Sequence, residues 1–280
     1  NPVMNISELT AAEIASIDKE KAVVLIPIGS VEQHGPHLPL GTKCFLSEAI
    51  ACEAEALLKK SGVITLVAPV LPFMPCQSSF GFPGCLSMGA RTFSDALYDI
   101  GHSFKREGFA FVYYVNLSIS PDALKAVAVA VEDLNTLNDF KAYDPMPLWN
   151  FSQNEKIEEF LRKIGLEASH ELHADVKETS ALLALDPGMV QTSMIRQLPR
   201  CQINPSWEVL KGNFSYQEMG SDSGYLGSPD AANAELGQIY LSEAGFALAE
   251  TVKFTIEGNE LPELPLQIRM LLKMVDLDEM

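Results

Sequence analysis

The stretch GSVEQHGPHLPLGTKCF, residues 29–45, places a carboxylate and an imidazole close together on one short segment. Glu32 and His34, with one residue between them, have the spacing of two metal ligands on a loop. The next side chain that could join them is Lys43, whose ammonium group has no lone pair to offer a cation. The segment therefore raises the question of whether this chain binds a metal here or uses the same residues without one.

Three short, nearly continuous apolar runs are the elements that must position this segment. Residues 22–28, 63–71 and 109–115 are each typical of a strand that is buried on both faces. Apolar residues recur at helical spacing in the stretches between and after these runs, namely 45–60, 93–107 and 121–137. The alternation predicts a three-layer α/β/α sandwich with a mostly parallel central sheet.

Ligands in such sheets collect beyond the carboxyl ends of the strands, so the loops after the three runs are where we expect chemistry. Two later segments, 143–156 and 212–230, are rich in Pro, Gly, Ser and aromatic residues, and we interpret both as long loops. The last long helix is predicted for residues 231–255, after the start signal Ser228-Pro229-Asp230.

Composition restricts the class of protein. A chain of 280 residues with 47% hydrophobic composition predicts one α/β domain spanning residues 1–280. Its longest apolar run is far below the ~20 residues that span a bilayer and follows no basic, apolar leader, so we expect a soluble, intracellular protein without a membrane partner. Five cysteines without CxxC spacing favour reduced thiols and a cytoplasmic location. The net charge of −17, without a Lys/Arg cluster, makes nucleic acid an unexpected partner.

Four segments carry a resemblance to a known family. IPIGSVEQHGPHLPLGT, FGFPGCLSM, HADVKETSALLALDP and GYLGSPDAANAELGQ follow one another between residues 26 and 238. In this order they resemble the creatininase family, also called creatinine amidohydrolase-like proteins. The resemblance implies an α/β hydrolase that opens C–N bonds in cyclic or linear amides with two divalent metals activating water. It also implies a homo-oligomer, between a dimer and a hexamer, that acts on a small-molecule substrate.

The departures from the family pattern fall on its metal ligands. The resemblance assigns a Glu and a His ligand to Glu32 and His34, but the bridging Asp is replaced by Lys43. The His ligand after the third strand is replaced by Ser118, and a further carboxylate found in some members is replaced by Ser120. In the second segment and just before it, the differences are Ser78 and Ser79 for the family's Glu-His pair and Cys85 for a Thr.

His173 and Glu178 resemble the family's proton-handling His and its neighbouring acid, on the two sides of a predicted helix start. We expect no dinuclear metal site, because the bridging carboxylate is missing and a lysine at ~4 Å would repel a cation by several kcal/mol. We interpret Lys43 as an internal replacement cation that pairs with Glu32 and Glu178. No cofactor is expected; if a single zinc or manganese ion binds, the resemblance leaves Glu32, His34 and Glu178 as its ligands.

Three hypotheses of function follow. The first is metal-independent or single-metal hydrolysis of a C–N bond, with His173 as acid/base, Glu178 orienting it, Lys43 stabilising an oxyanion, and Glu32 and His34 completing the catalytic set. Here the substrate would meet Ser118, Ser120, Trp149 and Cys85. The second is a non-catalytic relative that binds a small molecule or forms an oligomeric scaffold. The third is a covalent enzyme with Ser118 or Cys85 as nucleophile, activated by Lys43 or His173.

Each of these residues also has a structural interpretation. Glu32 and His34 could hold their loop together by hydrogen bonds, and Ser118 and Ser120 could end a strand and cap the next helix. Trp149 could equally be a packing anchor. His37 and Pro39 are expected to shape the loop, His102 and His170 to be solvated, and Cys44 and Cys85 to act as small apolar residues.

Overall fold

The computed structural model describes residues 4–278, apart from the side chains of Ser206 and Leu210. Its centre is a four-stranded sheet in the order β2-β1-β3-β4, in which every neighbouring pair is parallel. The strands are β1 (Val23–Ile28), β2 (Thr65–Val67), β3 (Phe111–Asn116) and β4 (Lys141–Tyr143). The first three strands and their parallel arrangement confirm the prediction from the sequence. The sequence missed β4, which is only three residues long and leads into the Pro-rich segment.

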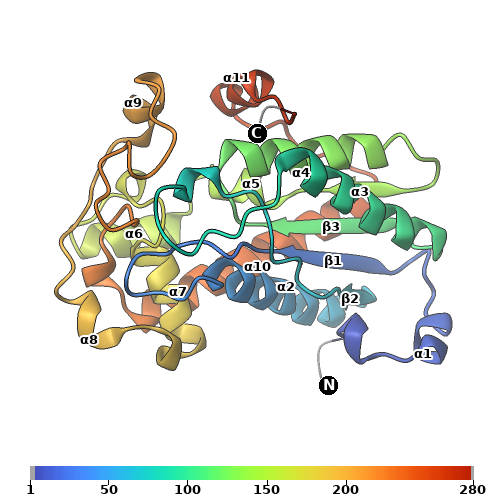
Figure 1. The fold of residues 1–280 in the computed structure, drawn as a ribbon. Coiled ribbons are helices and arrows are strands. Elements are labelled where there is room, and N and C mark those ends of the chain that lie inside the picture. Colours follow the sequence, from blue (N-terminus) through green and yellow to red (C-terminus); the bar gives the residue numbers. More distant parts are fainter. Residues whose placement is uncertain (1–3, 279–280) are drawn as a thin grey trace.

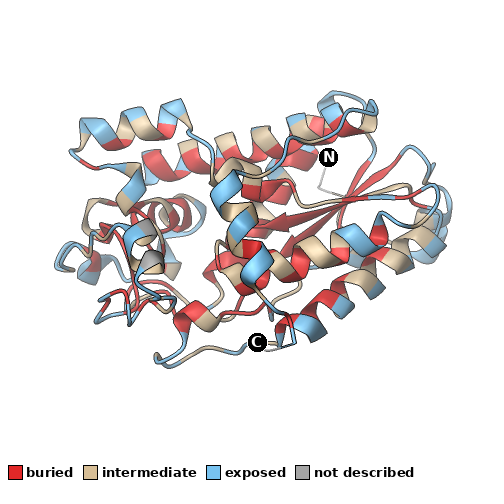
Figure 2. Ribbon diagram, turned by 90° about the horizontal axis from the view of Figure 1, so that it is seen from above, coloured by how far each residue is buried: buried red, intermediate tan, exposed pale blue. Residues whose placement is uncertain are grey.

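Helices cover both faces of the sheet, so the molecule has the three layers expected (Figure 1). One face packs against α3 (Ala90–Arg106) and α4 (Pro121–Leu134), where Val24 and Ile26 join Phe93 in one core. The other face packs against α2 (Thr42–Lys60), α7 (Val176–Leu185) and α10 (Ala234–Ile256), where Val23 and Leu25 join Leu248 in a second core. Successive residues of β1 therefore point into opposite cores, and the strand is buried throughout (Figure 2).

The remaining helices are short and lie mostly in the second half of the chain. They are α1 (Ala11–Ala15), α5 (Met146–Asn150), α6 (Glu155–Lys163), α8 (Thr192–Ile195), α9 (Pro205–Leu210), α11 (Leu266–Met274) and the 3₁₀ turns η1 (Ile6–Glu8), η2 (Gln77–Ser79), η3 (Ala168–His170), η4 (Pro187–Met189) and η5 (Pro229–Ala231). No helix among residues 4–278 is long and apolar enough to cross a membrane.

In this second half one expected loop contains a helix, and the last long helix is present but begins three residues later than predicted. The segment predicted as a loop at residues 143–156 contains α5, whose first turn includes Pro147, a residue suited to helix starts. The predicted start of the last helix after Asp230 is instead the isolated turn η5, and α10 begins at Ala234. Asn233 determines this start, because its side chain accepts a hydrogen bond from the Leu236 amide.

The junction between β1 and α2 brings the chemistry-bearing segment onto the end of the sheet. Gly29 follows β1 directly, and a Cβ atom there would lie 2.4 Å from the Cys44 Sγ atom. Only glycine permits this close approach of α2 to the end of the strand. As a result Lys43, in the first turn of α2, is buried beneath the loop that carries Glu32 and His34.

Candidate functional site

The Lys43 ammonium is the centre of a buried polar cluster. The Lys43 side chain is 5% exposed, and Nζ lies 3.3 Å from Glu32 Oε1, 3.6 Å from Glu178 Oε1 and 3.4 Å from His173 Nδ1. An ammonium has three N–H donors, and three acceptors surround this one. Burial opposes its charge, but the two carboxylates hold the pKa of Lys43 well above its ordinary value. The pairing of Lys43 with Glu32 and Glu178 expected from the sequence is thus present.

Glu32 is held by hydroxyl groups as well as by Lys43. The Ser30 hydroxyl donates to Oε1 at 2.8 Å, and the Ser79 hydroxyl donates to Oε2 at 2.6 Å. Burial alone would favour the neutral acid, yet the charge of Lys43 and the Ser79 hydrogen bond hold the pKa of Glu32 far below its usual range. Ser79, one of the two serines at the place where the resemblance suggested a Glu-His pair, therefore supports this carboxylate.

Glu178 lies in the first turn of α7, as the sequence predicted. Asp175 caps this helix by accepting from the Lys177 and Glu178 amides, and Glu178 Oε2 accepts from the Ala174 amide at 2.7 Å. Ala174 adopts a left-handed φ of 46°, which turns the chain between His173 and the helix. Burial opposes the charge, but Lys43 lowers the pKa of Glu178 to about 2.

His173 has partners for both ring nitrogens. Nε2 lies 2.9 Å from the Gln33 carbonyl oxygen, so we assign the proton to Nε2, which leaves Nδ1 to accept from Lys43. Burial and the Lys43 charge lower the pKa of His173 to about 3, so the ring is neutral at physiological pH. No hydrogen bond joins His173 to Glu178 among the described residues, although the sequence suggested that Glu178 orients this ring.

His34 has a free nitrogen. Its Nδ1 donates to the Glu32 carbonyl oxygen at 2.9 Å, whereas its buried Nε2 has no hydrogen-bond partner in the described part of the chain. Nε2 lies 3.9 Å from Glu178 Oε2, and burial lowers the pKa of the ring. The tautomer that satisfies Nδ1 therefore leaves a lone pair on Nε2, directed toward the Glu178 carboxylate.

Three of these side chains have the geometry of metal donors. One ligand atom from each of Glu32, His34 and His173 lies within 4.8 Å of the others, and all three residues are buried. The sequence suggested Glu178 as the third member of such a group and missed His173. The Lys43 Nζ atom contacts Glu32 and His173, two members of this group.

The residues expected to meet a substrate lie partly beside this cluster. The Ser118 hydroxyl accepts from the Ser120 amide, and the Ser120 hydroxyl lies 3.2 Å from the Ser78 hydroxyl. Ser120 precedes α4 at its N-cap, but its side chain makes no capping hydrogen bond. The Cys85 thiol donates to the Ser79 carbonyl oxygen at 3.3 Å, so this cysteine adjoins the residue that supports Glu32.

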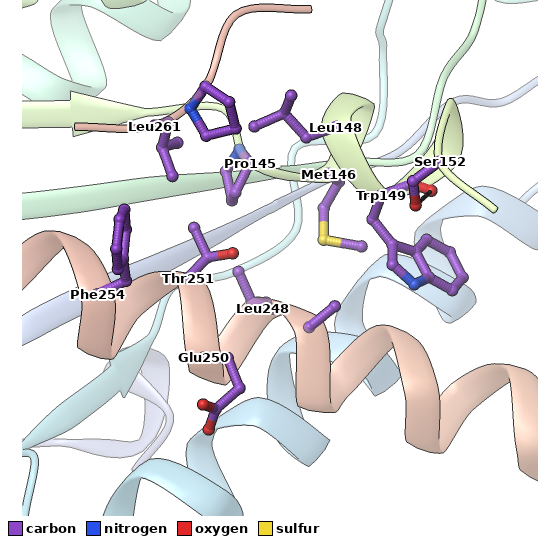
Figure 3. Close-up of a pocket in the computed structure, with 12 residues that line it drawn as sticks. Pro145, Met146, Leu148, Trp149, Ser152, Leu248, Glu250, Thr251, Phe254 and Leu261 are labelled. Carbon is purple, nitrogen blue, oxygen red and sulfur yellow. Dashed lines mark hydrogen bonds between the residues drawn. The ribbon is translucent and has the colours of Figure 1, made fainter. Parts of the chain in front are cut away.

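Trp149 lies in a pocket of about 430 Å³ between α5 and α10. It lines this pocket with Met146 on one side, opposite Leu248 and Phe254 of α10 (Figure 3). Its ring packs edge-on against Tyr240 with ring centroids 5.2 Å apart. Trp149 thus packs against Tyr240 and also lines a pocket.

The other histidines have structural surroundings. His37 Nε2 lies 3.0 Å from the Ala174 carbonyl oxygen and ties the first loop to the turn before α7. His102 stacks on Tyr98 along α3, and His170 is half-buried near Glu167. His37 thus helps to shape the loop, as expected, whereas His102 and His170 are half-buried and not the solvated histidines that the sequence suggested.

Sequence reasoning missed Gln33 and Tyr216. The Gln33 amide donates to the Gly224 carbonyl oxygen at 2.7 Å and thereby joins the first loop to the segment after residue 212. Tyr216 stacks on His173, with ring centroids 4.3 Å apart and an interplanar angle of 22°. Gln33 lies inside the segment that first drew attention, whereas no pattern in the Gly/Ser-rich stretch distinguishes Tyr216.

A parallel α/β fold with a titratable cluster at the carboxyl ends of its strands has the arrangement of ligand-binding and catalytic α/β proteins. The family model for creatininase (creatinine amidohydrolase) matches residues 7–252, so the chain belongs to the creatininase family. It is 24% identical to the creatinine amidohydrolase of Pseudomonas putida, covering 89% of this chain and 95% of that one. It is 26% identical to the mycofactocin precursor peptide peptidase of Mycolicibacterium smegmatis, covering 82% and 84%. A solved structure described as creatininase Mn superposes with a TM-score of 0.73 at 23% identity, covering 91% and 99%.

Proposed function

We propose that this protein hydrolyses a C–N bond of a small amide and that the Lys43 ammonium replaces the metal pair of its family. The observation that carries the proposal is the buried ammonium, held by two carboxylates and a neutral imidazole next to the free Nε2 atom of His34. The names of the relatives support the bond type, since a creatinine amidohydrolase and a peptide peptidase both cleave C–N bonds.

His34 and Glu178 are placed to act on an attacking water, with His34 as the general base. His34 Nε2 and Glu178 Oε2 lie 3.9 Å apart and are both acceptors, so together they can bind the two protons of an attacking water. As the water oxygen bonds to the amide carbon, His34 takes one proton and the carbonyl oxygen becomes negative. Lys43 supplies the positive charge near this oxygen. The C–N bond then breaks, and His34 returns the proton to the leaving nitrogen.

His173 has a positioning role in this scheme, because Lys43 and the Gln33 carbonyl oxygen engage both of its nitrogens. This assignment differs from the acid/base role that the family resemblance suggested. Glu32 retains a supporting role, since its two oxygens are bound by Ser30, Ser79 and Lys43.

The residues present do not fit a metal pair. Lys43 Nζ contacts the carboxylates that would ligate the ions, and a cation at about 4 Å from it would be repelled by about 4 kcal/mol per unit charge at an effective dielectric of 20. Ser118 and Ser120 offer neutral hydroxyls where charged or imidazole ligands would be needed. Glu32, His34 and His173 could hold one ion only if Lys43 withdrew or lost its proton.

A second function is favoured by the closure of the site. Glu32, Lys43 and Glu178 are 3%, 4% and 9% exposed, so the cluster presents almost no surface to solvent. A non-catalytic relative could keep this cluster as a folded salt bridge and bind its partner elsewhere. We further propose a single cytoplasmic domain that assembles into a homo-oligomer, which the free cysteines and the family membership support.

Amide hydrolysis in the presence of a chelator distinguishes these functions. We would assay creatinine, hydantoin and short peptides with wild type, with Lys43→Met and with Lys163→Met, a lysine that pairs with Glu159 on the surface. We expect chelator-insensitive release of product from at least one substrate, lost in Lys43→Met and retained in Lys163→Met. Absence of turnover in the wild type, or equal turnover in Lys43→Met, would contradict the proposal.

A further inference from the structure

The segment 212–220, which we call the strap, contacts His173 of the Lys43 cluster through Tyr216 and also buries Met219. Tyr216 is 3% exposed, stacks on His173 and donates its backbone N–H to the Ser78 carbonyl oxygen at 2.7 Å. Its neighbours Ser215 and Gln217 are half-buried and exposed, and Phe214 is 48% exposed. Tyr216 is therefore the aromatic residue through which the strap enters the site.

Glycines bound the strap at both ends. Gly212 and Gly220 have φ values of 87° and 97°, in the left-handed region that residues with a Cβ atom rarely adopt. Beyond the second glycine the chain is fixed again, because the Gln33 side chain donates to the Gly224 carbonyl oxygen. The backbone can thus change direction on both sides of Tyr216 while residue 224 stays in place.

The Tyr216 ring stacks on the imidazole ring of His173, next to the Lys43 cluster. Two rings lie close to His173, His34 at a centroid distance of 4.5 Å and Tyr216 at 4.3 Å. The Tyr216 ring is close to parallel to the imidazole, at 22°, as a planar ligand stacked there would be. An amide or a small cyclic amide is planar and has the thickness of one ring.

We propose that Tyr216 occupies the binding position of the substrate's planar group and that the strap must lift before a planar amide can stack on His173 in its place. The inference rests on the proposed function, which makes the substrate an amide. It also explains how a cluster that is less than one-tenth exposed can meet a substrate.

Modification of histidines by diethyl pyrocarbonate, read site by site by mass spectrometry, tests whether Tyr216 shields His173. The half-buried His102 and His170 serve as internal references. We expect His173 to react roughly tenfold or more faster in Tyr216→Ala than in wild type, because a buried aromatic contact that closes the strap is lost. Tyr216→Phe, which keeps the ring, and Phe214→Ala, an exposed strap position, should resemble wild type. Equal rates at His173 in Tyr216→Ala and wild type would overturn the proposal.

Hydrogen exchange in the wild-type protein tests whether the strap opens without unfolding of the sheet. We expect amides of residues 213–219 to exchange at least roughly 100-fold faster than those of β3, because opening of the strap does not require unfolding of the sheet. Exchange of both segments at one common slow rate would refute a moving strap.

Ligand protection tests the planar position itself. In Tyr216→Ala, millimolar creatinine or hydantoin should slow the modification of His173, and the acyclic, non-planar alcohol sorbitol should not. If neither cyclic amide protects His173, the assignment of the position to a planar group is wrong. Protection of His173 without hydrolysis would refute the proposed function and leave the inference about Tyr216 intact. Hydrolysis without protection of His173 and without fast hydrogen exchange in the strap would refute the inference and leave the proposed function intact.

Discussion

Removing the charge of Lys43 should leave two buried carboxylates unpaired. In Lys43→Met the apolar stem remains, but Glu32 and Glu178 lose a partner that lies 3.3 and 3.6 Å away. At an effective dielectric of 20 each contact is a gross attraction of about 5 kcal/mol. Because desolvation cancels part of this, we expect the free energy of unfolding to fall by about 3–5 kcal/mol, the range found when one partner of a buried pair is removed.

The pH dependence separates lost charge from lost packing. In wild type the pKa of Glu178 is lowered from 4.5 to about 2, so its contribution is complete above pH 4.5 and is lost as the pH falls toward 2. In Lys43→Met burial without a cation should raise the pKa of Glu32 or Glu178 above its ordinary value, so the variant should gain stability as the pH falls through that value. The difference between the two proteins should therefore shrink from about pH 7 to about pH 5.

Urea unfolding at several pH values measures this difference. Lys163→Met, which removes an exposed i,i+4 pair, is the matched control and should change little at any pH. A loss below about 1 kcal/mol in Lys43→Met, or a loss that stays constant with pH, would refute the role of Lys43 as the cation that neutralises the site.

Three further predictions concern the same cluster. Lys43→Asp alone should destabilise the protein by repulsion among three acids. Added zinc or manganese should raise the melting temperature of this variant, because the new aspartate joins the donor group of Glu32, His34 and His173, and equal melting temperatures with and without metal would count against this. Ser79→Ala should lower the free energy of unfolding by about 1.5–3 kcal/mol in urea melts, since a 2.6 Å hydrogen bond to a buried carboxylate is lost, and an unchanged midpoint would contradict that contact. His34→Asn keeps a donor to the Glu32 carbonyl oxygen and removes Nε2, so kcat on a substrate that wild type turns over should fall by about 10²–10⁴-fold. Because burial lowers the pKa of His34 from its ordinary value, the wild-type rate should stay flat above about pH 7, and a rate that still rises with pH there would refute the assigned base.

The sequence predicted the parts of the fold that follow from the spacing of apolar residues and missed the parts that tertiary packing determines. Three strands and their parallel order followed from long apolar runs, but β4 has three residues, and one of them, Lys141, is exposed, so it carries no apolar run. The pairing of Lys43 with Glu32 and Glu178 followed from charge compensation, which a sequence can show once the residues are known to share a cleft.

The rest of the site depends on contacts between distant segments. The tautomer of His173 is determined by the Gln33 carbonyl oxygen, 140 residues away in the sequence. One face of the His173 ring is covered by Tyr216, which comes from a Gly/Ser-rich stretch. No spacing rule connects these residues, since loops of this composition are placed by the surfaces they contact. Trp149, assigned to the substrate by resemblance, lies in the pocket between α5 and α10 because α5 directs it toward Tyr240.

The metal content of the wild-type protein tests the central claim most directly, because a buried ammonium and a metal pair cannot occupy one site. Protein purified without chelator would be dialysed against zinc or manganese and then against buffer, and the retained metal would be measured by mass spectrometry. We expect well under one equivalent per chain and an unchanged melting temperature after chelation. About two tightly held equivalents per chain, with a lower melting temperature once they are removed, would show that Lys43 does not replace the metals of this family.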